Sequence, residues 1–314
     1  MTEKQNIPYI GNGAYCYANS VAMLLASVGE EITPLTIEVL SGVGLGAFIL
    51  KGTNLLFFGC EVPDNGIDNA LRILGFDYLV GSVSKEKPAP ISQLKENLKK
   101  SPIVIGPLDM GYLVYNPYYL SLRGADHFVL VYGVDKNGVH LHDPAGFPHV
   151  ILSIDNLKVA WRAKGVWYSE EFYRYWAAPK RIKSPAADEI HKSAIELFKS
   201  LYKHSCKRAT GENWIVGKDA ILKFADRIRS GKVEQGEIEH LTHFALPLGA
   251  KRALDYVSFF NVFDGRLADL KKKQAILFGK VHTFAVDKDW KKMIISLEEL
   301  SEIEEEFRIS LLSK

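Results

Sequence analysis

The feature that most constrains this chain is a strand, a turn and a return strand near its middle. His127–Val134 is an apolar run of strand-forming residues, and Val139–His142 alternates apolar with polar side chains. Between them, Asp135-Lys136-Asn137-Gly138 contains the Asn-Gly pair that is typical of tight hairpin turns. The pattern therefore predicts an antiparallel hairpin. A symmetric hairpin joining residues 127 and 143 would fold one or two residues before this turn, so we expect a β-bulge at Gly133.

Short helices precede this hairpin. Residues 18–29 carry apolar side chains at helical spacing and end at a glycine that can adopt the left-handed conformation of a helix end. We expect further helices over 65–74 and 92–100, the latter capped by Ser92, and a buried strand over 103–105. Helices followed by an antiparallel sheet indicate the α+β fold class.

The composition changes after residue 176. Residues 179–185 are basic and bounded by prolines, as in a linker. Beyond them helical patterns predominate, over 188–201, 218–230, 241–260, 265–281 and 296–312. We therefore predict two domains, residues 1–183 and a mostly helical domain of residues 184–314.

Composition limits the functional classes. The 314 residues are 47% hydrophobic and 24% charged, as in an ordinary globular protein. The net charge is −3 over residues 1–179 and +5 over residues 180–314, which suits an acidic partner or an anionic substrate but not nucleic acid. Three cysteines make no disulfide framework, and neither a signal peptide nor a membrane-spanning stretch is evident. We expect a cytoplasmic protein with no nucleic-acid or membrane partner.

Cys16, His127 and Asp143 form the most informative combination of side chains. Cys16 lies at or just before the start of the predicted helix 18–29, whose N-terminal end favours a thiolate. His127 begins one strand of the hairpin and Asp143 ends the other, so the carboxylate could orient the imidazole. The pattern is typical of a nucleophile with its base. The alternative is a thiol that only packs in the core, beside a hydrogen-bonded strand histidine.

The stretch from Asn12 to Gly165 resembles the N-terminal domain of the butirosin biosynthesis protein H family. The residues that carry the resemblance are Tyr15-Cys16 before an apolar helix, Ser41-Gly-Val-Gly-Leu-Gly-Ala-Phe48, Asp126-His-Phe-Val-Leu-Val-Tyr-Gly-Val-Asp135, His142-Asp-Pro-Ala-Gly146 and Trp161-Arg-Ala-Lys-Gly165. The segments around His127 and Asp143 are also similar, more distantly, to bacteriocin-processing cysteine peptidases. The helical half resembles the second region of the butirosin-type family weakly.

This resemblance implies a papain-like cysteine-nucleophile domain with an antiparallel sheet. It implies Cys16 as nucleophile, His127 as general acid/base and Asp143 as the residue that orients the histidine. The named family member moves an aminoacyl chain from a carrier-protein thioester to an aminoglycoside amine. For this chain the resemblance implies an acyltransferase, with an acyl thioester donor, an acyl carrier protein as a candidate partner and a small-molecule amine as acceptor. The helical domain could supply the acceptor or carrier-protein surface.

Further residues are candidates for this site. Asn12 could donate to an oxyanion beside the backbone N–H of Cys16, or could simply form a turn in Gly11-Asn12-Gly13. Tyr15 stands where family members often have histidine. Tyr115 and Tyr119 belong to an aromatic cluster that either packs the sheet edge or lines a substrate pocket, and all three tyrosines are candidate substrate-binding residues.

Two other functions remain open at this stage. The same three residues could make a hydrolase or peptidase with water as acceptor, or the domain could be a catalytically silent binding module. We predict no metal site and no cofactor, because the His140-Leu-His142-Asp143 segment has no cysteine or carboxylate cluster to complete a ligand set. The sequence does not indicate an oligomeric state.

Overall fold

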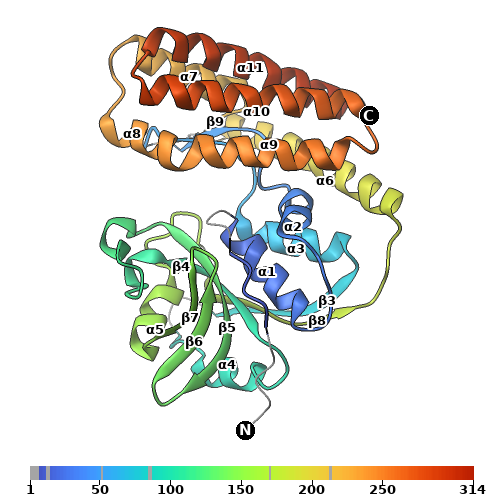
Figure 1. Ribbon diagram of the computed structural model, residues 1–314, viewed down its shortest axis with the longest axis vertical. Coiled ribbons are helices and arrows are strands. Elements are labelled where there is room, and N and C mark those ends of the chain that lie inside the picture. Colours follow the sequence, from blue (N-terminus) through green and yellow to red (C-terminus); the bar gives the residue numbers. More distant parts are fainter. Residues whose placement is uncertain (1–6, 12–14, 51, 84–86, 170, 212–213) are drawn as a thin grey trace. The chain divides into compact units, whose positions relative to one another are not determined.

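The computed structural model describes residues 7–11, 15–50, 52–83, 87–169, 171–211 and 214–314, with residues 206–211 described by their backbone alone. The chain forms two compact units (Figure 1). One comprises residues 1–37 and 63–185, and the other comprises residues 38–62 and 186–314. The first unit combines helices with an antiparallel sheet and the second is mostly helical, which confirms the predicted α+β class and the helical C-terminal region.

The first unit is built on a six-stranded sheet with the strand order β3-β8-β4-β5-β6-β7. Every neighbouring pair in this sheet is antiparallel. In chain order the strands are β3 (Phe76–Val83), β4 (Ile103–Asp109), β5 (Asp126–Asp135), β6 (Gly138–Asp143), β7 (Phe147–Leu152) and β8 (Phe172–Arg181).

The hairpin of β5 and β6 has the predicted irregularity. Val131 pairs with Leu141, but the next pair is Gly133 with His140, so β5 contains one extra residue. This confirms the expected β-bulge. A bulge bends its strand and increases the local twist, and here it lies in the same hairpin that carries His127 and Asp143 at its open end.

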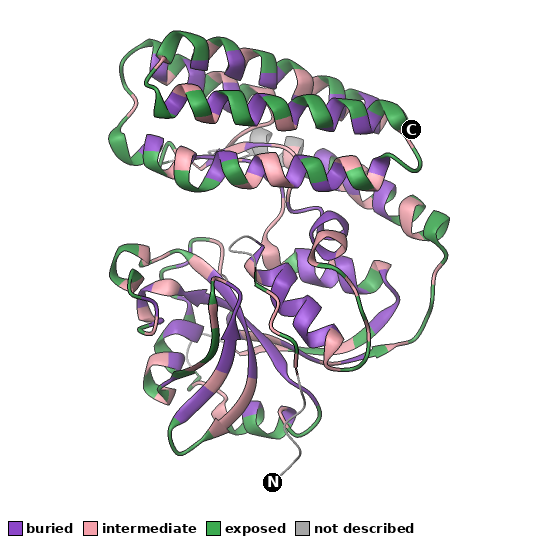
Figure 2. Ribbon diagram, viewed as in Figure 1, coloured by how far each residue is buried: buried purple, intermediate pink, exposed green. Residues whose placement is uncertain are grey.

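Helices cover both faces of this sheet. The helices of the first unit are α1 (Cys16–Ala26), α3 (Pro63–Ile73), α4 (Ile91–Asn97) and α5 (Ile154–Arg162), and α2 (Pro34–Ser41) crosses into the second unit. Figure 2 shows the central strands buried between them. Trp161 of α5 packs in a core with Val129 and Val131 of β5, whereas Tyr17 of α1 contacts Phe128, whose side chain points to the other face.

Two sequence predictions about the first unit are wrong. Ser92 does not cap the third helix, because α4 begins at Ile91 after Pro90 and Ser92 lies inside its first turn. The linker predicted over residues 179–185 also begins too early, since Pro179 and the two basic residues after it belong to β8. Pro179 fits there because the pairing of β8 with β3 is interrupted between Asp77 and Leu79, where no ladder hydrogen bond is required.

The second unit contains a small sheet and a set of packed helices. Its strands are β1 (Phe48–Leu50), β2 (Leu56–Phe57) and β9 (Trp214–Val216), in the order β2-β1-β9. Its helices are α6 (Ala187–Gly211), α7 (Lys218–Arg229), α8 (Gln235–His240), α9 (Leu246–Phe260), α10 (Gly265–Val286) and α11 (Trp290–Leu312), with a π-helical turn at Leu241–Ala245. No helix among the described residues is both long and apolar enough to cross a membrane.

The unit boundary differs from the predicted division at residue 183. Residues 38–62, which the sequence analysis assigned to the first domain, pack with the second unit. The reason is pairing that sequence order does not reveal, since β1 forms an antiparallel pair with β9. Glu38 is fully buried and accepts a hydrogen bond from Arg252 Nε at 2.7 Å. Removing either member of this pair would leave a buried charge without its partner.

Candidate active site

Cys16 is the first residue of α1, as the sequence predicts. Its N–H belongs to the first turn, where N–H groups have no acceptor within the helix. The helix is fixed against the sheet by Ser20, whose Oγ donates to the carbonyl oxygen of Phe128 at 3.1 Å. Because Phe128 follows His127, this contact sets the position of the Cys16 end of the helix relative to the histidine. The Cys16 side chain is partly exposed, whereas Cys60 is buried.

His127 connects the other two candidate residues. Its Nε2 lies 2.7 Å from Oδ1 of Asp143, and both side chains are almost fully buried. Cys16 also lies close enough to the histidine side chain to raise its pKa. Since Nε2 is occupied by the carboxylate, Nδ1 is the ring nitrogen left for the thiol. The structure therefore brings together all three residues that the sequence analysis singled out.

Asp143 is held by three donors. Besides His127, the N–H of Ala145 donates to Oδ1 at 2.7 Å and the hydroxyl of Tyr115 donates to Oδ2 at 2.8 Å. The backbone is fixed as well, because Tyr9 donates its hydroxyl to the Asp143 carbonyl oxygen at 2.9 Å. A buried carboxylate with both oxygens occupied in this way has a defined orientation toward the imidazole.

The charges of this group favour an ionised histidine. Burial alone would lower the pKa of His127, but the charge and hydrogen bond of Asp143, together with the interaction with Cys16, outweigh it and hold the pKa well above its ordinary value. Burial would likewise raise the pKa of Asp143, but His127, the Ala145 N–H and Tyr115 hold it below its ordinary value. An imidazolium beside a thiol stabilises the thiolate, the form that acts as a nucleophile.

The remaining predicted residues have different positions. Asn12 lies outside the described residues. Tyr15 precedes α1 in the left-handed conformation, with φ of 58°, and its side chain is buried. Tyr119 begins a short 3-10 helix, Tyr119–Leu122, and is half-buried. Tyr115 contacts Asp143 rather than standing apart from the candidate triad, so its observed position is that of a support for the carboxylate.

A second group of polar side chains, not found from the sequence, adjoins the candidate triad. Asp126 directly precedes His127 and accepts a hydrogen bond from the Tyr168 hydroxyl at 2.8 Å. Burial, then the charges of Asp126 and Asp64, and finally Cys16 raise the pKa of Tyr168 well above its ordinary value. The charges of Asp64 and Cys16 therefore both act on the Tyr168 hydroxyl.

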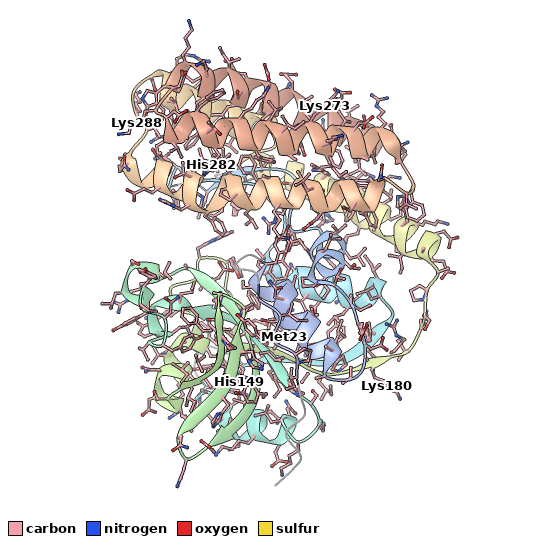
Figure 3. The ribbon with its side chains drawn as sticks, in the orientation of Figure 1. Met23, His149, Lys180, Lys273, His282 and Lys288 are labelled. Carbon is pink, nitrogen blue, oxygen red and sulfur yellow. The ribbon has the colours of Figure 1, made fainter. Side chains whose placement is uncertain are left out.

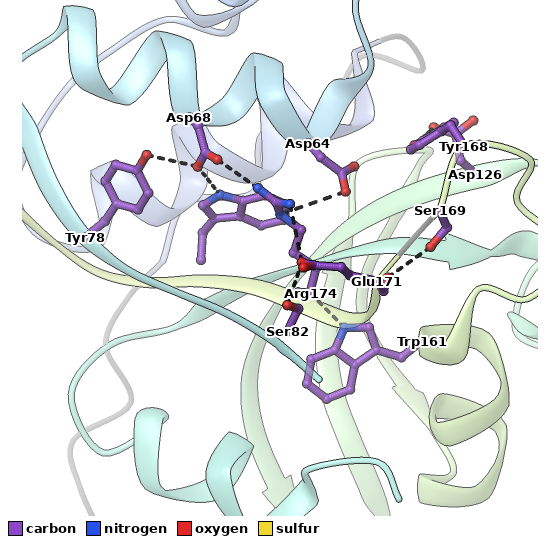
Figure 4. Close-up of polar contacts among 11 residues, drawn as sticks. Asp64, Asp68, Tyr78, Ser82, Asp126, Trp161, Tyr168, Ser169, Glu171 and Arg174 are labelled. Atoms are coloured by element: carbon purple, nitrogen blue, oxygen red, sulfur yellow. Dashed lines mark hydrogen bonds and ion pairs between the residues drawn. The ribbon is translucent and has the colours of Figure 1, made fainter. Parts of the chain in front are cut away.

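Asp64 is the least satisfied member of this group (Figure 4). Arg174 donates to Asp68 at 2.8 Å, but its Nε is 3.9 Å from Oδ2 of Asp64. Oδ1 of Asp64 is buried and has no hydrogen-bond partner among the described residues. Burial raises the pKa of Asp64 to about 7 despite the attraction of Arg174, and the nearby carboxylates of Asp126 and Asp68 add to the effect.

The histidines considered as metal ligands are engaged in other contacts. His140 Nε2 lies 3.0 Å from Oδ2 of Asp135. His142 Nδ1 accepts the backbone N–H of His149 at 3.1 Å. Within the part of the chain that the structure describes, no three His, Cys, Asp or Glu side chains gather closely enough to hold a metal ion.

The fold and the candidate site together define a class of protein. It has an α+β fold in which a cysteine at a helix N-terminus lies near a histidine and an aspartate from a β-hairpin. Over 304 residues the chain is 41% identical to the uncharacterized protein YobF of Bacillus subtilis (strain 168), and the match covers 97% of this chain and 98% of that protein. A family model described as the YobF C-terminal domain matches residues 211–312, all within the second unit. The chain belongs to the YobF family.

Proposed function

We propose that this protein is a cysteine-dependent acyltransferase that moves an acyl group from a thioester to a small-molecule amine. The observation that carries the proposal is His127, whose Nε2 lies 2.7 Å from Asp143 Oδ1 and whose pKa is raised by both Asp143 and Cys16. That arrangement suits a thiolate–imidazolium pair, which needs no separate step to activate the nucleophile.

In the first half of the reaction, the Cys16 sulfur attacks the thioester carbonyl carbon. The carbon–sulfur bond to the donor breaks, and His127 gives its proton to the departing thiolate. In the second half, the amine nitrogen attacks the acyl-enzyme, His127 takes a proton from that nitrogen, and the bond between the acyl carbon and Cys16 breaks. Asp143 keeps the imidazole in one orientation through both halves.

The oxyanion of each tetrahedral intermediate needs donors near the acyl carbon. The backbone N–H of Cys16 is the first, since it lies in the N-terminal turn of α1. Asn12 is the proposed second donor. The Asp126–Tyr168 pair adjoins the same region and is suited to contact a polar or cationic acceptor.

Transfer rather than hydrolysis is favoured by the resemblance to the butirosin-type acyltransferases and, with it, a papain-like arrangement of the first unit. The helical second unit is proposed to supply the surface that binds the acceptor or the carrier protein. An acidic acyl carrier protein is the proposed donor. The alternatives are a papain-like hydrolase with water as acceptor and a binding module in which Cys16 only packs.

Intact-mass measurement after incubation with a panel of acyl thioesters tests the proposal. We expect a mass increase of one acyl group on the wild-type protein and none on Cys16→Ala, with loss of the group when a suitable amine is added. Asp143→Asn is the matched control for the triad, because it keeps the thiol and should form the adduct slowly. Hydrolysis without transfer to any amine would support the hydrolase, and the absence of an adduct with every thioester would support the binding module.

A further inference from the structure

The second unit has a surface groove between α10 and α11 that reaches Leu222 of α7 and has a volume of about 850 Å³. Two isoleucines line it with much of their surface in contact with solvent. Ile276 of α10 is 53% exposed and Ile295 of α11 is 47% exposed. Isolated exposed apolar residues are common, but two that line one groove form a patch suited to a partner.

Opposite charges flank this apolar centre. On α10, Lys273 and Lys280 lie three residues before and four residues after Ile276, so all three occupy one helix face. On α11, Glu299 and Glu302 stand four and seven residues after Ile295, again on one face. Figure 3 labels Lys273 on this unit.

These four charged side chains have no ion-pair partners in the described part of the chain. Glu298, the neighbouring carboxylate of the groove, differs because it accepts a hydrogen bond from Arg229. The groove therefore has a row of lysines along one side and a row of glutamates along the other, with each row still able to pair.

We propose that this groove binds a second copy of the chain, with a two-fold axis running along the groove. Such an axis places α10 of one copy over α11 of its partner, so that each lysine row meets a glutamate row and the exposed isoleucines lie inside the interface. A two-fold axis across the groove would instead place lysines over lysines. Charge complementarity thus selects one of the two face-to-face arrangements.

The axial positions of the charges agree with this arrangement. The helices α10 and α11 are joined by a short connection, residues 287–289, and run antiparallel side by side (Figure 1). Residues at equal distances from that connection lie level with each other, which sets Lys273 level with Glu302. A two-fold axis along the groove leaves the position of each residue along that axis unchanged. Lys273 therefore faces Glu302 of the second copy, and Glu302 faces Lys273 of the second copy.

Sedimentation velocity on the full-length chain tests the proposal. We expect a reversible dimer with a dissociation constant on the order of 10⁻⁵ M at low salt, weakening as salt is added, because the apolar centre is small and the ion pairs are exposed. Lys273→Glu and Glu302→Lys should each raise the dissociation constant about tenfold, since each reversal acts twice in a symmetric dimer. Lys192→Glu, an exposed reversal on α6 outside the groove, should leave it unchanged.

Mixing the two reversed variants gives the most discriminating result. The mixed pair has glutamate at 273 facing lysine at 302, and glutamate at 302 facing lysine at 273. We therefore expect a heterodimer that forms more tightly than either variant forms with itself. A wild-type chain that stays monomeric at about 500 μM, a dimer unaffected by either reversal, or a mixture that does not associate would overturn the proposal.

Discussion

Replacing Asp64 by asparagine should change how the stability of the protein depends on pH. Its carboxyl group is 13% exposed, its Oδ1 has no donor among the described residues, and Arg174 is 3.9 Å away. Burial raises the pKa of this group to about 7, whereas an unfolded aspartate has its ordinary pKa of 3.8. Between these values the folded protein holds a proton that the unfolded chain has lost, so stability falls as the pH rises through this window.

The magnitude follows from the width of that window. One pKa unit corresponds to about 1.36 kcal/mol, so the full window costs the wild-type protein about 4 kcal/mol. Between pH 5 and pH 8, about two pH units fall inside this window, so the free energy of unfolding of the wild type should decrease by about 3 kcal/mol. Asp64→Asn removes the titration. The free energy of unfolding of the variant, minus that of the wild type, should therefore become more positive by about 3 kcal/mol over this range.

Urea-induced unfolding followed by tryptophan fluorescence measures this difference, since Trp176 donates a hydrogen bond to Asp68 in the same cluster. Asp269→Asn on the exposed surface of α10 is the control and should change little with pH. If the difference stayed constant between pH 5 and 8, or if the wild type gained stability relative to Asp64→Asn as pH rose, Asp64 would be ionised in the folded protein and the reasoning would be wrong.

Three further predictions concern the candidate site and its support. Tyr115→Phe leaves one oxygen of the buried Asp143 carboxylate without a donor. Chemical denaturation should therefore show that the free energy of unfolding falls by about 1–3 kcal/mol, and a decrease below about 0.5 kcal/mol would count against the contact. Cys16 should react with iodoacetamide faster than buried Cys60, and peptide mapping that finds equal rates would contradict the triad. Gly106→Ala should destabilise the protein by about 1–3 kcal/mol in the same denaturation assay, because its Cβ would overlap the buried ring of Phe128, and unchanged stability would contradict this packing.

The parts of the fold that the sequence predicted are those specified by local pattern. The hairpin of β5 and β6 follows from an apolar run, an Asn-Gly turn and an alternating return strand. Its bulge follows from a mismatch between the turn and the ends of the strands. The long helices of the second unit follow from apolar spacing. In each case the information lies within about twenty consecutive residues.

The missed elements depend on partners far away in the chain. β8 contains Pro179 and two basic residues, and is a strand because it pairs with β3 and β4 on either side. β1 is three residues long and belongs to the second unit because it pairs with β9 and packs Ile49 into the core of that unit. Neither strand has a composition that a local pattern distinguishes from a loop, so contacts of long sequence separation decide both.

The candidate site shows the same division. The sequence singled out Cys16, His127 and Asp143 because their residue types and local positions have chemical meaning. Asp64 and Tyr168 were not singled out, since an aspartate near the start of a helix and a tyrosine in a loop are ordinary on their own. Asp126 could have been included in the candidate site because it directly precedes His127. Nothing in the sequence indicated that the Tyr168 hydroxyl donates a hydrogen bond to it.

The connection between β4 and β5 explains why Tyr115 could not be assigned from sequence. Asp109 is buried and accepts backbone N–H groups from Gly111 at 2.9 Å and from Gly124 at 2.8 Å, which joins the two ends of this connection. A loop closed at its base by one carboxylate can hold a tyrosine in one place at its far side. The orientation of Asp143 therefore depends on Asp109 through Tyr115, although neither residue is near Asp143 in the sequence. Positioning of this kind comes from the tertiary structure, and the role proposed for His127 depends on it.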